Sequence, residues 1–232
     1  MKDQAREKLN AVIPADHSKQ SDAFRMFRSH VERLSDDVNR ILDLGAGVGN
    51  SYDRLVKFVP GLQYTGLDIE SSPEVARRAR SDLRFVTYDG EQIPFGDDAF
   101  DAIFCKQVLE HVRRPDVVIA EVARVLRSGG LFVGSVSQLE PYHSHSIFNW
   151  TAYGLFRVLS DHGLNLIELR PGIDGISLTL RRLFGRKNFE RSFSVSSIFN
   201  HYIDVELGKR NIQDKNFQKL IIAGHIVFAA IR

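Results

Sequence analysis

The sequence predicts an α/β protein in which helices cover both faces of a parallel sheet. Three observations carry this prediction. Runs of strand length alternate with helical runs from residue 40 onward, a glycine-rich turn joins the first strand directly to a helix, and an acidic residue stands near the end of each of the first three strands. Such alternation is typical of doubly wound sheets, because each parallel strand needs a crossover.

The elements are expected in the following order. A first helix should begin after Ser21 and Asp22, which suit an N-cap, because apolar residues then recur at helical spacing. The first five strands are expected at residues 41–44, 62–68, 84–89, 100–105 and 131–137. Helices are expected at residues 73–80, 116–126 and 151–163, and two last strands at residues 164–170 and 225–231.

Composition narrows the function classes. The net charge of +2, from 31 Lys+Arg against 29 Asp+Glu, gives no strong field for nucleic acid or an anionic membrane. The most apolar window, residues 220–231, is too short to span a bilayer, and the first residues lack the apolar core of a secretory signal. The single cysteine, Cys105, cannot form an internal disulfide, so we expect a cytoplasmic setting.

The stretch RILDLGAGVGNS, residues 40–51, turns a strand into a helix through three glycines at alternate positions, Gly45, Gly47 and Gly49. Such a turn presents free backbone N–H groups and lets a nucleotide-like ligand approach the backbone closely. The nicotinamide and flavin fingerprint would require a glycine at position 50, where Asn50 stands.

Acidic residues complete this pattern. Asp68 closes the second strand 19 residues after Gly49, where a carboxylate can accept hydrogen bonds from both hydroxyls of a ribose. Asp89 ends the third strand, well placed to meet an adenine edge, and Asp43 precedes the glycine turn and could orient it.

Taken together, ILDLGAGVGNS, YTGLDIE, VTYDGEQIPFGDDAFDAIFCKQVLEHV and LRSGGLFVGSV resemble the class I S-adenosylmethionine-dependent methyltransferases. The resemblance is specific over residues 40–137. It implies a three-layer, Rossmann-like sheet of seven strands in the order 3-2-1-4-5-7-6, with the last strand antiparallel, and S-adenosyl-L-methionine as cofactor, released as S-adenosyl-L-homocysteine. The cofactor-binding residues that it implies are Asp43, Gly45, Gly47, Gly49, Asp68, Ile69, Asp89 and Gly90.

On this reading the whole chain, residues 1–232, is one methyltransferase domain, and residues 171–219 form a helical insertion before the last strand. We expect the insertion to be a lid or wall over the methyl acceptor, because its aromatic residues exceed what a plain connection needs. These aromatics are Phe184, Phe189, Phe193, Phe199 and Tyr202. They could instead fill a small core, or pair two chains into a homodimer.

Two histidines are the candidate catalytic residues. His111 follows the fourth strand, where family substrates meet the methyl group, and a neutral imidazole there could take a proton from a hydroxyl. His143 lies in the loop after the fifth strand with His145, Tyr142 and Trp150, and such loops line the cleft. His111 could equally be structural, with its ring bonded to a neighbouring loop.

Other chemistries fit less well. His143 and His145 could bind a metal, but no carboxylate or third histidine stands at a usual spacing, so the sequence predicts no metal site. Cys105 lacks the preceding proline of the cytosine-modifying branch, and we expect it to be buried. FCKQ replaces the motif of amino-methylating enzymes that act on nucleic acid, which argues for a small-molecule substrate.

The stretch PYH…WTAYGLFRVLSDHGLNLIELRPG, residues 141–172, is similar to a branch common among enzymes that modify sugars and polysaccharide precursors, although it lacks that branch's Pro and Arg between histidine and threonine. The sequence therefore favours O-methylation of a sugar or another hydroxylated metabolite. C- or N-methylation is the alternative within the class. A catalytically inactive cofactor-binding partner and a Rossmann oxidoreductase are the alternatives outside it.

Overall fold

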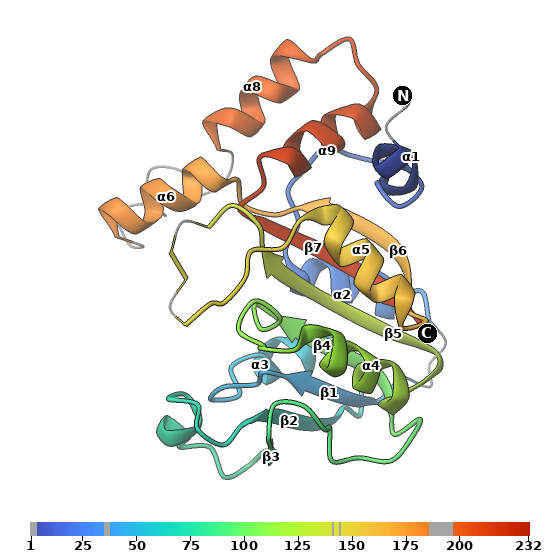
Figure 1. The fold of residues 1–232 in the computed structure, drawn as a ribbon, viewed down its shortest axis with the longest axis vertical. Helices are drawn as coiled ribbons and strands as arrows, with labels where there is room; N and C mark the ends of the chain where they lie inside the picture. The colour runs from blue at the N-terminus through green and yellow to red at the C-terminus, as the bar shows by residue number, and fades with distance from the viewer. Residues whose placement is uncertain (1–3, 35–37, 141, 144, 186–196) are drawn as a thin grey trace.

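The computed structural model describes residues 4–34, 38–140, 142–143, 145–185 and 197–232. Its seven strands form one sheet in the order β3-β2-β1-β4-β5-β7-β6, which confirms the order implied by the family resemblance (Figure 1). The strands are β1 (Arg40–Leu44), β2 (Gln63–Ile69), β3 (Arg84–Tyr88), β4 (Phe100–Lys106), β5 (Leu126–Ser137), β6 (Asn165–Pro171) and β7 (His225–Ile231). β7 lies antiparallel between β5 and β6, whereas β1 to β5 pair in parallel.

Helices cover both faces of this sheet. One apolar core joins it to α2 (Ala23–Val31) and α3 (Tyr52–Leu55), and the other joins it to α4 (Pro115–Val125) and α5 (Ala152–Asp161). Asp22 caps α2 as expected, because its carboxylate accepts hydrogen bonds from the backbone amides of Phe24 and Arg25. The three-layer arrangement brings the carboxyl ends of β1, β2 and β4 to one edge.

One expected helix does not form. Residues 73–80 contain only a 3₁₀ turn, η1 (Val75–Arg77), and none of the residues of that turn is buried. A short helix without an apolar stripe to bury gains too little to offset its nucleation cost. The fifth strand is also longer than expected, because it begins at Leu126 directly after α4, with its register shifting between Phe100 and Ala102 of β4.

The expected insertion carries the helices α6 (Gly175–Phe184), α8 (Ile198–Glu206) and α9 (Ile212–Ile221). α9 is tied to the N-terminal segment that follows α1 (Gln4–Asn10). The amide of Asn216 donates to the carbonyl oxygens of Pro14 and His17, and the buried ammonium of Lys219 donates to Ser18. Lys219 also pairs with Asp204 of α8 at 2.7 Å. The N-terminal segment and the insertion therefore pack together above the sheet (Figure 1).

Among the residues that the structure describes, the helices are all too short or too polar to cross a bilayer.

Candidate active site

The glycine turn after β1 has the backbone geometry that excludes side chains. Gly45, Gly47 and Gly49 all have positive φ, at 74°, 53° and 87°. A Cβ atom at Gly45 would lie 2.2 Å from Cγ2 of Val108, in the turn after β4. The amide of Gly45 donates to the carbonyl oxygen of Leu67 at 2.8 Å, which holds the turn against β2. The glycine turn is thus a bare cradle beside the carboxyl end of β4.

Asp43 is buried beneath this cradle, with 1% of its surface exposed. Its carboxylate accepts a hydrogen bond of 2.6 Å from the hydroxyl of Tyr64 on β2. Burial raises the pKa of Asp43 to about 7, although hydrogen bonds from Tyr64 and Ser51 oppose that rise. Ionisation of Asp43 at this buried position therefore lowers the free energy of unfolding.

We expect Asp43→Asn to stabilise the protein at alkaline pH. The pKa of Asp43 in the folded protein lies above its ordinary value of 3.8, so ionisation removes stability as the pH rises through about 7. The variant keeps an oxygen that can accept from Tyr64 but carries no charge. Its melting temperature should exceed that of the wild type at about pH 8, and the gap should narrow toward about pH 5. The control is Asp161→Asn, at an exposed ion pair on α5, which should have the wild-type melting temperature at both pH values. A difference in melting temperature between Asp43→Asn and the wild type that does not change with pH would contradict this account.

Asp68 and Ile69 end β2 beside the cradle. The carboxylate of Asp68 accepts hydrogen bonds from the backbone amides of Gly47 at 2.7 Å and Ile69 at 2.8 Å. Each carboxylate oxygen can accept more than one hydrogen bond, so Asp68 keeps capacity for the hydroxyls of a ribose. Ile69 is 39% exposed, which leaves its apolar face available to a flat ring.

Asp89 and Gly90 follow β3 and reach the same edge, because Ile69 pairs with Tyr88 in the parallel register. A Cβ at Gly90 would lie 3.4 Å from Cγ2 of Ile69. One oxygen of Asp89 accepts from the amides of Glu91 and Gln92, and these bonds lower the pKa of its carboxyl. The structure therefore brings all eight expected cofactor residues to one edge of the sheet.

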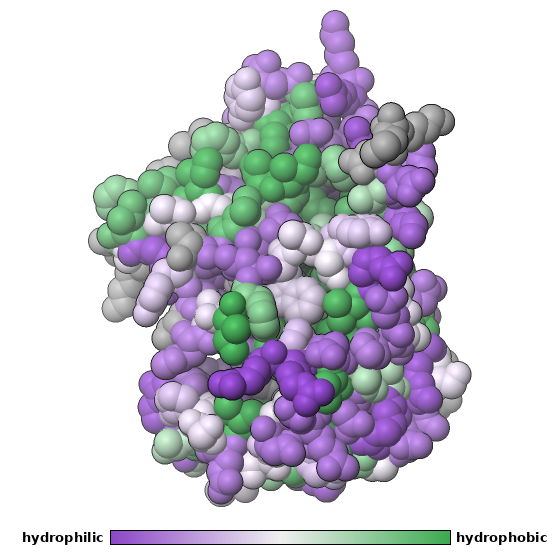
Figure 2. Space-filling view, in the orientation of Figure 1, coloured by the Kyte–Doolittle hydropathy of each residue, from purple (hydrophilic) through white to green (hydrophobic). Residues whose placement is uncertain are grey.

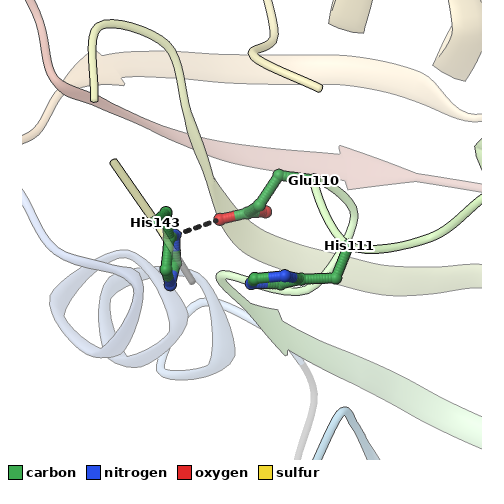
Figure 3. Close-up of side chains that lie close together, drawn as sticks. All are labelled: Glu110, His111 and His143. Carbon is green, nitrogen blue, oxygen red and sulfur yellow. Dashed lines mark ion pairs between the residues drawn. The ribbon is translucent and has the colours of Figure 1, made fainter. Parts of the chain in front are cut away.

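The two candidate catalytic histidines also come together. The ring centroids of His111 and His143 are 4.6 Å apart in an edge-to-face arrangement. Glu110 lies above both rings with its side chain fully buried, and its Oε1 is 3.5 Å from Nδ1 of His143 (Figure 3). The amide of His111 donates to the carbonyl of Val108, the residue that touches the glycine cradle. The pair of histidines therefore adjoins the presumed cofactor edge.

A buried polar cluster supports these histidines. The hydroxyl oxygen of Ser137 lies 3.0 Å from carboxylate oxygens of both Glu110 and Glu140, and 3.2 Å from Nδ1 of His143. A hydroxyl has one proton, so it can donate to only one carboxylate. Glu110, Ser137 and Glu140 were not among the residues that the sequence pointed to; the only signal was that Glu110 precedes His111.

The charges in this cluster favour a protonated His143. Hydrogen bonds to Glu110 and Glu140 raise the pKa of His143 to about 9. The pKa of Glu140 lies well below its ordinary value because His143, His225 and Arg182 donate to it, in spite of its burial. His143 thus carries a proton near neutral pH, and its stabilisation is lost as the pH rises through about 9.

The other residues considered from the sequence lie elsewhere. Tyr142 and His145 are exposed, whereas Trp150 is buried in the core under α5. Cys105 is fully buried, and burial raises the pKa of its thiol well above the ordinary value, so it is no nucleophile. Phe189 and Phe193 lie outside the described residues.

Comparisons with known proteins agree with this geometry. Residues 42–134 match a family model described as a methyltransferase domain. A fatty-acid O-methyltransferase from Mycolicibacterium smegmatis is 34% identical over 126 residues, which are 52% of this chain and 46% of the relative. A demethylmenaquinone methyltransferase from Renibacterium salmoninarum is 35% identical over 95 residues, 40% of this chain and 39% of the relative. The chain thus spans less than half the length of these relatives.

Solved structures share the fold at low sequence identity. A geranyl diphosphate methyltransferase in complex with S-adenosylmethionine superposes with a TM-score of 0.57 at 18% identity, over 90% of this chain and 84% of that one. The [4+2]-cyclase SpnF superposes with a TM-score of 0.58 at 20% identity, over 98% of this chain and 93% of that one. A cyclase and a methyltransferase on one fold show that the fold alone does not decide the reaction.

The sheet order, the glycine cradle and the acidic strand ends are those of the fold shared by class I S-adenosylmethionine-dependent methyltransferases. Residues 42–134, the part of the chain that carries the glycine cradle and the acidic strand ends, are the part that matches the methyltransferase-domain model.

Proposed function

We propose that this protein transfers a methyl group from S-adenosylmethionine to an oxygen atom of a small, lipophilic, hydroxylated molecule. The observation that carries the proposal is the pair of His111 and His143, which adjoins both the glycine cradle and an exposed apolar surface. A group that takes a proton at the edge of a cofactor site suits methylation of a hydroxyl.

The residues at the cofactor edge fit the cofactor. When bound, S-adenosylmethionine supplies a methyl group on a positively charged sulfur. The bare backbone of Gly45 and Gly47 would lie against its methionine part, and Asp68 would accept from its ribose hydroxyls. Ile69 would cover one face of the adenine, and Asp89 would accept from its amino edge.

The two histidines would divide the work on the acceptor. We assign the base to His111, which would take the proton of the acceptor hydroxyl. His143 is protonated near neutral pH, so it would donate a hydrogen bond and hold the acceptor oxygen instead of taking a proton. Glu110 and Glu140 hold His143 in place from a buried position, where they cannot themselves reach the acceptor easily.

The surface beside this cluster favours a lipophilic acceptor over a free sugar. Large apolar side chains are exposed on the loop between β5 and α5, on α6 and on α8, and Figure 2 shows apolar surface over α6 and α8. We call this the apolar surface; it consists of Leu139, Tyr142, Ile147, Phe148, Ile176, Leu183, Phe184, Phe199, Tyr202 and Val205. Exposed patches of this kind mark ligand or interaction sites. Two relatives are named for a fatty acid and for demethylmenaquinone, and these names also favour a lipophilic acceptor.

Contacts of α6 support the role of the insertion as a wall of the acceptor site. Arg182 of α6 donates to the carboxylate of Glu140, which also bonds His143. A Cβ at Gly175 would lie 2.9 Å from Cβ of Leu139, so the start of α6 packs on the loop that carries His143. These contacts support the assignment of the insertion to the acceptor side.

The direct test is methyl transfer from labelled S-adenosylmethionine to a panel of fatty acids, hydroxylated lipids, quinols and free sugars, with products identified by mass spectrometry. We expect an O-methylated lipophilic product. Transfer to carbon or nitrogen, or to free sugars alone, would contradict the assignment of the acceptor. Binding of S-adenosylhomocysteine without transfer to any component of a metabolite extract would indicate the inactive cofactor-binding partner.

We expect Leu183→Glu to impair use of the acceptor without affecting the cofactor. Leu183 is 72% exposed on α6, so the substitution costs no core packing but adds a charge to the apolar surface. The KM for the lipophilic acceptor should rise by roughly tenfold, about 1.4 kcal/mol. S-adenosylhomocysteine affinity, measured by titration calorimetry, should stay within about threefold.

Val56→Glu is the matched control, because Val56 is also exposed but lies at the end of α3, outside the apolar surface. An unchanged KM in Leu183→Glu would sink the assignment of α6 to the acceptor. A change of oligomeric state instead of KM, seen by light scattering, would assign the surface to the pairing of two chains.

A further inference from the structure

Glu110, His111 and His143 form a set of possible metal ligands that the sequence spacing hides. Each offers one ligand atom, and these atoms lie within 4.8 Å of one another (Figure 3). Two imidazoles and one carboxylate are a donor set that Zn²⁺ takes in sites that keep an open position, and other divalent transition metals accept it too. We propose that these three side chains bind one divalent transition-metal ion beside the methyl acceptor.

Glu110 provides an independent reason for this site. Its side chain is fully buried, and its Oε2 has no hydrogen-bond partner among the described residues. Its Oε1 is shared between Ser137 and His143. A buried carboxylate oxygen without a partner is costly, and an ion bound by the carboxylate would remove that cost.

The charges around His143 also favour a cation. Nδ1 of His143 lies 3.3 Å from Glu140 and 3.5 Å from Glu110, so two buried carboxylates meet one imidazole. Glu140 has further basic partners in Arg182 and His225, whereas the only basic side chain bonded to Glu110 among the described residues is His143.

The ligands need only a modest closure. Atoms that share a tetrahedral zinc at bonds of about 2.0–2.1 Å lie roughly 3.3 Å apart, so the side chains must approach one another by rotation. The two loops that carry them are already joined, because the amides of Ile147 and Phe148 donate to the carbonyl of Glu110 at 2.7 and 3.2 Å. His143 is 24% exposed, which leaves a side of the cluster open to the acceptor oxygen.

The role of the ion rests on the proposed function, although its binding does not. An acceptor hydroxyl bound at the open position would lose its proton to solvent water more readily, because a bound divalent cation lowers the pKa of an oxygen ligand. In the metal-bound protein His111 and His143 would be neutral ligands and the ion would activate the hydroxyl, so the roles of base and hydrogen-bond donor given to them above apply to the metal-free protein.

The test measures metal directly. Protein prepared without a histidine tag is incubated with Zn²⁺ or Co²⁺ and dialysed, and retained metal is measured by mass spectrometry. We expect one ion per chain in the wild type and visible d–d absorption from bound Co²⁺. Glu110→Gln and His143→Asn should each weaken binding by at least about tenfold. His162→Ala, at the exposed end of α5, should bind as the wild type does.

S-adenosylhomocysteine titration verifies that the variants remain folded. If the wild type retains no more metal than the Glu110→Gln/His143→Asn double variant, the metal site is refuted, whether or not methyl transfer occurs. If metal binds stoichiometrically but no acceptor is methylated, the metal site stands and the proposed function fails. Loss of metal in His162→Ala as large as in the cluster variants would place the ion elsewhere and refute the proposal.

Discussion

Asp68→Ala is expected to weaken S-adenosylhomocysteine binding by at least about a hundredfold. A hydrogen bond to a charged group contributes roughly 1.5–3 kcal/mol, and Asp68 would accept two from the ribose. The loss also frees the amide of Gly47, which Asp68 holds at 2.7 Å, so the glycine cradle loses an anchor. Titration calorimetry with S-adenosylhomocysteine measures the effect directly.

Two further variants separate these contributions. Asp68→Asn keeps one oxygen that can accept from Gly47, so it should bind more tightly than Asp68→Ala but more weakly than the wild type. Asp161→Ala removes an exposed acid that pairs with Arg157 on α5 and should leave binding unchanged. Wild-type affinity in Asp68→Ala would contradict the ribose assignment, and binding of a nicotinamide cofactor instead would favour the oxidoreductase alternative.

His111→Ala is expected to lower kcat by roughly 10²–10⁴-fold, the usual contribution of a positioned general base. The side chain lies against His143 rather than in the cofactor cradle, so S-adenosylhomocysteine affinity should remain within about threefold. The acidic limb of the pH–rate profile should also be lost, because the group that must be deprotonated is gone. The measurement is initial rate against pH with the best acceptor from the panel.

His111→Gln serves as the conservative comparison, because it keeps a hydrogen-bonding side chain but cannot take a proton at neutral pH. It should fold normally and be nearly as slow as His111→Ala. Near wild-type turnover in both variants would show that the acceptor needs no base, as for an acceptor that is already a carboxylate. If His111 had only a structural role, its substitution would instead lower the melting temperature and leave the shape of the pH–rate profile nearly unchanged.

The position of the residues expected to bind the cofactor could be predicted from the sequence, because local geometry fixes where they lie. Positive φ at Gly45, Gly47 and Gly49 is a property of the turn itself. Asp68 and Asp89 end neighbouring parallel strands, and the register of such strands brings their ends together. The helix expected at residues 73–80 did not form, because helical spacing there had no apolar face to bury.

The acceptor half depended on contacts between distant segments. Glu110 and His143 are far apart in sequence, and only the adjacency of β4 and β5 brings the loops that follow them into contact. Spacing along the chain could not reveal Glu110 as a partner of His143, whereas Glu140 stands three residues before His143 and only its burial depends on the fold. The same contacts raise the pKa of His143 and lower that of Glu140, and the contributions of Glu110, His225 and Arg182 come from segments distant in the chain.

The sequence by itself determined the sheet and, through the family resemblance, its strand order, because periodicity and glycine turns act over a few residues. The cofactor roles of the residues at the edge of that sheet stay a prediction. Only the tertiary structure decided that His111 and His143 meet, that Glu110 is buried beside them, and that Arg182 of the insertion reaches the same cluster. The physical reason is that the burial of a side chain and the charges beside it depend on which segments pack together. That packing involves contacts between residues from the whole chain.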